Sequence, residues 1–330
     1  MGLVTSKSEK PVLKLSPQGD YLSWDDCYAG IHWMARTGGG KTTAASVLAA
    51  GLLRGQAGGC VTVAKSSDIA LWKHYAKKHG RSESIVLFDE NAGFNFLDYD
   101  LARHGMDGAS GSVVEALMKV IDAARNTSSA ASHRPGDVFW EDSMRECLRY
   151  TIPALYAANG SVSIPDIIRF VSTAPATLRD PVDRAWQARS FMYKKLNAAL
   201  CEPKVPMSEA ALTNAISFWS ERWASMPEKT KGNVVATISS TLDRFNHGKL
   251  NRAFCQRTTI VPELSLGGMV TLLAMPTHTW NEVGVIAQKI FKFYFIRMVL
   301  TRNSLPQKYR DRPLFIFSDE AQETVDSEDG

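Results

Sequence analysis

The stretch HWMARTGGGKTTAAS, residues 32–46, decides the fold class of this chain. A phosphate-binding P-loop reads G-x-x-x-x-G-K-[ST], and Gly40, Lys41 and Thr42 supply its last three positions. Ala35 stands where the first glycine of that pattern belongs. Alanine is the least disruptive substitute there, because it strains the loop only if the position needs a positive φ. The stretch therefore predicts a loop that holds the phosphates of a nucleotide.

Each polar part of this loop has an expected task. Consecutive glycines let the backbone curl so that successive N–H groups point at an anion. Lys41 is expected to bring a catalytic cation to the β and γ phosphates, and the Thr42 hydroxyl is an expected ligand of Mg²⁺. The nucleotide-binding residues expected from the loop are Thr37, Gly38, Gly39, Gly40, Lys41, Thr42 and Thr43.

The segments on either side of the loop support this interpretation. Upstream, the short apolar run GIHWMA (30–35) predicts a strand that leads into the loop. Downstream, TTAASVLAAGLLRG (42–55) is rich in Ala and Leu and predicts a helix that ends at Gly55. The N-terminus of such a helix would face the phosphates.

The partner motif lies near the other end of the chain, in RPLFIFSDEAQ (312–322). Its continuous apolar run predicts a buried parallel strand, and the acid pair Asp319–Glu320 follows at the carboxyl end of that strand, where ligands bind in open α/β sheets. Asp319 is expected to bind Mg²⁺ through a water molecule of its coordination shell, and Glu320 is expected to polarise the attacking water. Together with the loop, the motif predicts magnesium-dependent hydrolysis of a nucleoside triphosphate.

The segments between the two motifs separate into two patterns. Apolar β-rich runs at 60–64, 84–88 and 268–276 alternate with helical patterns and predict an α/β fold with a parallel sheet. Helical spacing without strand-like alternation fills most of 105–250. We therefore expect a RecA-like P-loop NTPase domain formed by 1–104 and 251–330, with an all-helical insertion at 105–250. The chain stops shortly after Asp319, so the C-terminal part of the motor fold is expected to be missing.

Composition places few limits on function. The 330 residues carry a formal net charge of +4, which permits a nucleic-acid partner without requiring one. The five cysteines show no metal-ligand spacing and are expected to be reduced thiols. No apolar run reaches the roughly 20 residues that span a bilayer, so a cytoplasmic location is expected.

Several motifs taken together show a family resemblance. FDENAGFNFLDYD (88–100) contains an Asn-x-Leu-Asp signature, and a helical insertion opens near FWEDSMRECL (139–148). MPTHTWNEVGVIAQKIFKFYFIRMVLTR (275–302) then precedes the strand that ends in FSDEAQ (317–322). In this order the motifs resemble the conjugative coupling ATPases of type IV secretion systems, in the FtsK/HerA branch of P-loop motor proteins. The resemblance covers most of 28–323.

This resemblance implies a ring, a hexamer, that hydrolyses ATP with Mg²⁺ between neighbouring subunits and moves DNA or DNA-linked protein. Secretion and relaxosome proteins are the implied partners, and recruitment to the inner membrane would occur only through them. Gln322 joins the implied nucleotide-binding residues. Ala35, the absence of a transmembrane segment and the missing end of the motor domain depart from the usual pattern.

Other functions remain open from the sequence. One is a secretion ATPase that exports pilus subunits or proteins without handling DNA, and another is a HerA-like DNA-processing motor. A third is a non-hydrolysing scaffold whose assembly depends on nucleotide.

Overall fold

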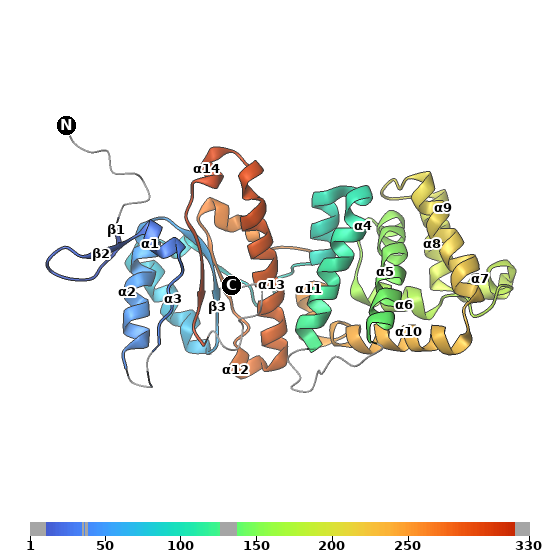
Figure 1. Cartoon of the computed structure of the whole chain (residues 1–330), viewed down its shortest axis with the longest axis horizontal. Helices are drawn as coiled ribbons and strands as arrows, with labels where there is room; N and C mark the ends of the chain where they lie inside the picture. The colour runs from blue at the N-terminus through green and yellow to red at the C-terminus, as the bar shows by residue number, and fades with distance from the viewer. Residues whose placement is uncertain (1–10, 35, 37–38, 126–136, 321–330) are drawn as a thin grey trace. The chain divides into compact units, whose positions relative to one another are not determined.

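The structure of the chain is a computed structural model that describes residues 11–34, 36, 39–125 and 137–320 (Figure 1). The chain divides into two compact units. The sheet unit consists of Met1–Asp89, Val261–Gly284 and Phe291–Gly330. The helical unit consists of Glu90–Ile260 and Val285–Ile290.

A parallel sheet of four short strands forms the centre of the sheet unit, with the strand order β4-β5-β3-β6. The strands are β3 (Gly58–Thr62), β4 (Ile85–Leu87), β5 (Val270–Leu273) and β6 (Leu314–Ser318). Short, continuous apolar runs of this kind are typical of parallel strands that are covered on both faces. The predicted α/β class is confirmed, and each strand overlaps one of the predicted apolar runs.

Helices cover both faces of this sheet (Figure 1). One face packs against α2 (Lys41–Arg54) and α3 (Ser66–Lys78), and the other lies beside the sheet-unit part of α13 (Glu282–Thr301). Each apolar side chain buried in this way contributes about 1.5–3 kcal/mol. The core on the α2 and α3 face consists of Ala49, Leu53, Val61, Val63, Trp72, Val270 and Leu272.

Short elements complete the sheet unit. β1 (Pro11–Lys14) and β2 (Tyr21–Ser23) form an antiparallel pair, and α1 (Trp24–Tyr28) follows at once because Ser23 and Asp26 form a capping box. A second apolar cluster joins this region to α2 through Val12, Trp24, Leu48, Leu52 and Ala57. The remaining helices of the unit are α12 (Thr277–Trp280) and α14 (Gln307–Arg310).

The segment upstream of the phosphate loop differs from its prediction. Residues 31–34 adopt no regular secondary structure, so the strand expected at 30–35 is wrong for its described part. A strand needs a neighbour that accepts its backbone hydrogen bonds, and no described strand pairs with this segment. Instead, Ile31 and Trp33 pack on the cluster that contains Trp24 and Leu48, and this burial holds the segment in place.

Every element described between residues 90 and 260 is a helix. The two longest are α4 (Phe96–Arg125), which kinks where Gly105 has φ of 68°, and α5 (Asp137–Asn159). Trp219 and Trp223 lie on a π-helical turn, Phe218–Trp223, and are 0% and 2% exposed, so they are core residues. The others are α6 (Ile164–Ser172), α7 (Arg184–Arg189), α8 (Phe191–Cys201), α9 (Glu209–Ser217), α10 (Glu228–Leu242) and α11 (Gly248–Phe254).

The Asn-x-Leu-Asp signature lies at the start of α4. Oδ1 of Asn95 accepts the backbone N–H groups of Leu97 and Asp98, so this asparagine caps the helix. Its Nδ2 donates to the carbonyl of Val162, in the turn before α6, over 2.8 Å. In this chain the signature therefore ties two segments of the helical unit together. None of the described helices is both long enough and apolar enough to cross a membrane.

Candidate nucleotide site

The start of α2 is directed to the carboxyl edge of the sheet. Only residues 55–57 connect the end of α2 to the beginning of β3, so the helix runs antiparallel to that strand. Its first residue, Lys41, therefore lies toward the edge where β3 and β6 end. α2 carries no acidic residue in its first turn, which leaves the positive end of the helix dipole uncompensated.

Two backbone features are described in the loop in front of α2, at Gly40 and at Gly39. Gly40 precedes the helix with φ of 81°, a left-handed conformation that glycine adopts without steric cost. The N–H of Gly39 donates to the carbonyl of Arg36 over 2.9 Å, which turns the chain tightly just before the helix. Thr42 and Thr43 follow in the first helical turn, and both are exposed.

The acid pair lies where the sequence predicts it, directly after β6. The backbone N–H of Glu320 donates to Oδ1 of Asp319 over 3.1 Å. Glu320 itself has φ of 54°, in the left-handed region that favours glycine. A non-glycine residue held there costs about 1–3 kcal/mol, and such strain concentrates at functional sites.

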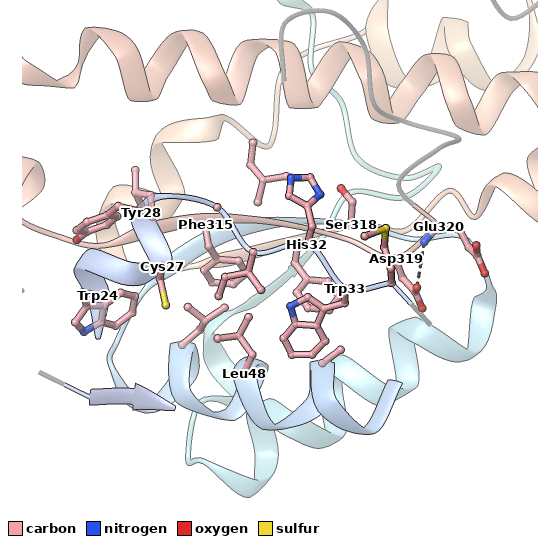
Figure 2. Close-up of a pocket in the computed structure, with 18 residues that line it drawn as sticks. Trp24, Cys27, Tyr28, His32, Trp33, Leu48, Phe315, Ser318, Asp319 and Glu320 are labelled. Atoms are coloured by element: carbon pink, nitrogen blue, oxygen red, sulfur yellow. Dashed lines mark hydrogen bonds between the residues drawn. The ribbon is translucent and has the colours of Figure 1, made fainter. Parts of the chain in front are cut away.

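A cavity of about 780 Å³ is lined by residues on either side of the loop and by the acid pair. Its lining includes Met34 from the segment before the loop, Ala45 from the second turn of α2, and both acids after β6. Figure 2 shows Asp319 and Glu320 at one end of the cavity and the aromatic side chains of Trp24 and Tyr28 at the other. Segments from the two ends of the chain therefore form the walls of one cavity.

The sequence patterns did not predict this aromatic end. Trp24 and Tyr28 come from α1, and His32 and Trp33 come from the segment after it. No local motif marks them, because their proximity depends on the packing of that segment against α2 and β6. Burial raises the pKa of Cys27, which also lines the cavity, so its thiol stays protonated near neutral pH.

The residues predicted for nucleotide binding are placed only in part. Gly39, Gly40, Thr42 and Thr43 lie at or beside the start of α2, and Asp319 and Glu320 line the cavity. Lys41 is the first residue of α2, and its side chain lies outside the described part of the structure. Outside the described residues altogether are Ala35, Thr37, Gly38 and Gln322.

The oxygen donors in this region fit a magnesium ion. Mg²⁺ prefers hard oxygen ligands and keeps several waters, so it needs only one or two groups from the protein besides phosphate oxygens. The Asp319 carboxylate and the exposed Thr42 hydroxyl are donors of that kind. Within the described residues no three His, Cys, Asp or Glu side chains form a metal-binding group.

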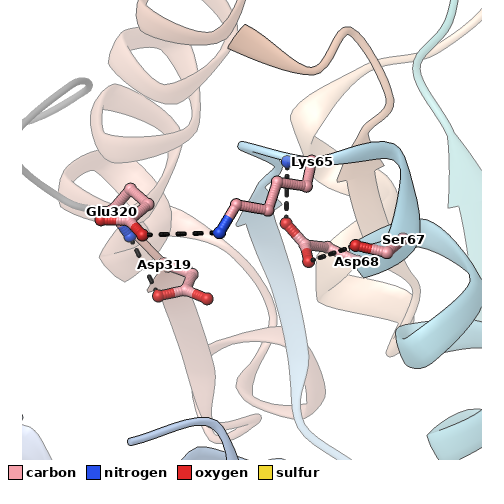
Figure 3. A network of polar contacts seen from close by, with 5 residues as sticks. All are labelled: Lys65, Ser67, Asp68, Asp319 and Glu320. Carbon is pink, nitrogen blue, oxygen red and sulfur yellow. Dashed lines mark hydrogen bonds and ion pairs between the residues drawn. The ribbon is translucent and has the colours of Figure 1, made fainter. Parts of the chain in front are cut away.

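A lysine that the sequence analysis did not single out lies beside the acid pair (Figure 3). Nζ of Lys65 is 3.8 Å from Oε1 of Glu320. Lys65 follows the end of β3, and its backbone N–H donates to Oδ2 of Asp68 in the first turn of α3 over 2.9 Å. A lysine three residues after a buried strand and directly before a helix was the available signal.

Comparisons with protein-family models, with curated proteins and with solved structures find no match for this chain.

Proposed function

We propose that the sheet unit is a RecA-like P-loop domain that binds ATP with Mg²⁺ and hydrolyses it. The observation that carries this proposal is the single cavity lined by Met34 before the glycine loop and by Asp319 and Glu320 after β6. An anion-binding helix start and an acid pair at the neighbouring strand end are the two halves that nucleotide hydrolysis requires.

In this proposal each group has a defined task. The backbone N–H groups of the loop and the start of α2 bind the phosphates, and Lys41 adds a cation. Thr42 and Asp319 would hold Mg²⁺, which would neutralise phosphate charge when bound. Glu320 accepts a proton from the attacking water as the water oxygen bonds to the γ-phosphorus, and the bond from that phosphorus to the β–γ bridging oxygen breaks to release ADP and phosphate.

We further propose that hydrolysis drives the movement of DNA, in a ring with ATP at the subunit interfaces. The support for this step is the resemblance to the coupling ATPases of conjugation and type IV secretion, above all the order of the motifs at 88–100, 139–148, 275–302 and 317–322. Secretion and relaxosome proteins are the proposed partners.

The test is magnesium-ATP hydrolysis with and without DNA, comparing the unmodified chain with Lys41→Ala and Glu320→Gln. We expect turnover that rises with DNA and falls by at least about 100-fold in both variants, while Glu320→Gln still binds nucleotide. Lys73→Ala removes an exposed lysine from α3 and serves as the control.

The other functions predict different results. Turnover that does not change when DNA is added would favour a secretion ATPase for protein or pilus export. Nucleotide-dependent assembly without phosphate release would favour the scaffold. Equal turnover in the unmodified chain and in Lys41→Ala would overturn the proposal.

A further inference from the structure

Two local irregularities, joined by an ion pair, meet at the carboxyl edge of the sheet. Lys65 occupies the N-cap of α3, a position that favours Ser, Thr, Asp, Asn or Gly. Glu320 occupies a left-handed backbone conformation that favours glycine. The two side chains form an ion pair with each other. Natural sequences depart from local preference mainly where function demands it.

The fold brings these two residues together through strand pairing. β3 and β6 are neighbours in parallel register, with Thr62 beside Ser318. Lys65 and Glu320 follow those two residues by a few positions, so they leave the sheet side by side (Figure 3). Two hydrogen bonds with Asp68 fix the backbone of Lys65: the Lys65 N–H donates to Oδ2 of Asp68 over 2.9 Å, and the Asp68 N–H donates to the Lys65 carbonyl over 3.0 Å.

Stability does not explain this ion pair. The Lys65 and Glu320 side chains are 52% and 27% exposed, and the gap of 3.8 Å is long for a charge-assisted hydrogen bond. Exposed pairs of this kind contribute little to folding, since solvent screens them and two long side chains lose freedom. The unfavourable N-cap residue and the strained glutamate both act against stability as well.

We propose that Lys65 is a positioning residue for the hydrolysis reaction: its ammonium group holds the Glu320 carboxylate directed toward the end of the cavity. This inference rests on the proposed function, in which Glu320 is the group that accepts a proton from water. Lys65 contacts the Glu320 carboxylate from the end of the neighbouring strand, with Nζ 3.8 Å from Oε1, and this contact favours one orientation of the glutamate side chain.

The inference predicts a specific kinetic pattern. Lys65→Met should lower kcat by about tenfold or more, as expected for loss of one orienting contact in the transition state. KM for magnesium-ATP should change less than about threefold, because Lys65 contacts the glutamate rather than the nucleotide. Lys65→Arg should restore most of kcat, since it keeps the positive charge. The matched control is Lys73→Met, which removes an exposed lysine from the middle of the same helix.

A second variant separates positioning from structural support. Lys65→Ser places a favourable N-cap residue on α3 and should raise Tm by about 2 °C. It removes the ammonium group at the same time and should therefore lower kcat as strongly as Lys65→Met. A merely structural lysine would not give higher stability together with lower turnover.

The outcomes distinguish this inference from the proposed function. If the unmodified chain hydrolyses ATP and Lys65→Met does so at the same kcat, the role of Lys65 is overturned while the proposed function stands. Failure of Lys65→Arg to rescue turnover also overturns it. If the unmodified chain and Lys41→Ala show the same turnover, the proposed function fails and the role of Lys65 falls with it.

Discussion

The hydroxyl of Ser161 donates a hydrogen bond to Oδ2 of Asp98 over 2.7 Å, although the two residues lie 63 positions apart. The backbone N–H of Val162 donates to the other oxygen of the same carboxylate, also over 2.7 Å. Asn95 donates to Asp98 as well, over 3.0 Å. The first turn of α4 thereby holds the connection between α5 and α6.

Removal of this carboxylate should destabilise the helical unit. Asp98→Ala leaves the backbone N–H of Val162 and one of the two N–H groups of the Asn95 amide without their acceptor, and we expect the free energy of unfolding to fall by about 2–4 kcal/mol. Chemical denaturation followed by circular dichroism measures this change. Asp142→Ala is the control, because its side chain is 70% exposed and its removal should change stability by less than about 0.5 kcal/mol. Equal effects of the two substitutions would contradict the assignment.

The same carboxylate predicts a pH dependence. Burial raises the pKa of Asp98, and hydrogen bonds from Ser161 and Val162 offset only part of that rise. The folded chain therefore holds a proton on Asp98 more tightly than the unfolded chain does. Its contribution to stability is fully present below pH of about 4 and is lost as the pH rises through the raised pKa.

The Asp98→Asn variant isolates this contribution, since it cannot titrate at that position. The stability of the unmodified chain relative to Asp98→Asn should decline between pH 4 and pH 7, as measured by denaturation at each pH. A relative stability that rises over this interval would show that hydrogen bonding outweighs burial and lowers the pKa instead.

The left-handed backbone of Gly40 makes a prediction about the loop. Gly40→Ala meets open space but is strained at φ of 81°, so it should destabilise the fold by about 1–2 kcal/mol and weaken ATP binding through distortion of the loop. Gly19 also has open space and a positive φ of 111°, in the β1–β2 connection. Gly19→Ala should lower Tm similarly and leave ATP affinity unchanged. Thermal unfolding and equilibrium nucleotide binding measure the two effects.

At Glu320 the backbone strain is already present, so a substitution that relieves it should have the opposite effect on stability from Gly40→Ala. Glu320→Gly removes the clash at φ of 54°, so the free energy of unfolding should stay level or rise by up to about 1 kcal/mol while turnover is lost. Gln56→Gly relieves a similar φ of 58° between α2 and β3 and should preserve turnover. A clear loss of stability in Glu320→Gly would mean that the side chain contributes more to folding than its backbone costs.

The packing of Trp72 links the core to the acid strand. Its ring stacks on Phe315 at a centroid distance of 5.9 Å and meets Phe317 edge-on at 5.1 Å. Trp72→Ala should lower the free energy of unfolding by about 3–5 kcal/mol. It should also reduce turnover at temperatures where the chain is still folded, because Phe315 and Phe317 both belong to β6. Trp186→Ala removes a tryptophan that is 6% exposed in the helical unit. It should lower stability without reducing the turnover of the folded chain.

The strands and the acid pair could be predicted because their signals are local. The apolar run 314–317 ends in Ser318 and Asp319, and such a run is interpretable without knowledge of its neighbours. The run at 30–35 looks the same in sequence, yet its described part forms no strand, since pairing depends on a partner elsewhere in the chain. Local composition alone therefore cannot distinguish an apolar run that forms a strand from one that does not.

The arrangement within the candidate site could not be predicted for the same reason. The left-handed backbone of Glu320 and its ion pair with Lys65 depend on the register between β3 and β6. The aromatic side chains of Trp24 and Trp33 reach the cavity through the path of the segment between them. Each of these features arises from tertiary contacts that no single stretch of sequence encodes.

The cavity has a consequence for biogenesis. One wall, at Met34, leaves the ribosome early, and the other, at Asp319, is synthesised only after most of the chain. The helical segments between them are complete before β6 is synthesised, whereas the pairing of β6 with β3 must close a very long loop. A nascent chain therefore carries three of the four strands, with the β6 side of β3 uncovered, until the last strand arrives, and we expect chaperone binding or misassociation to concentrate in this interval.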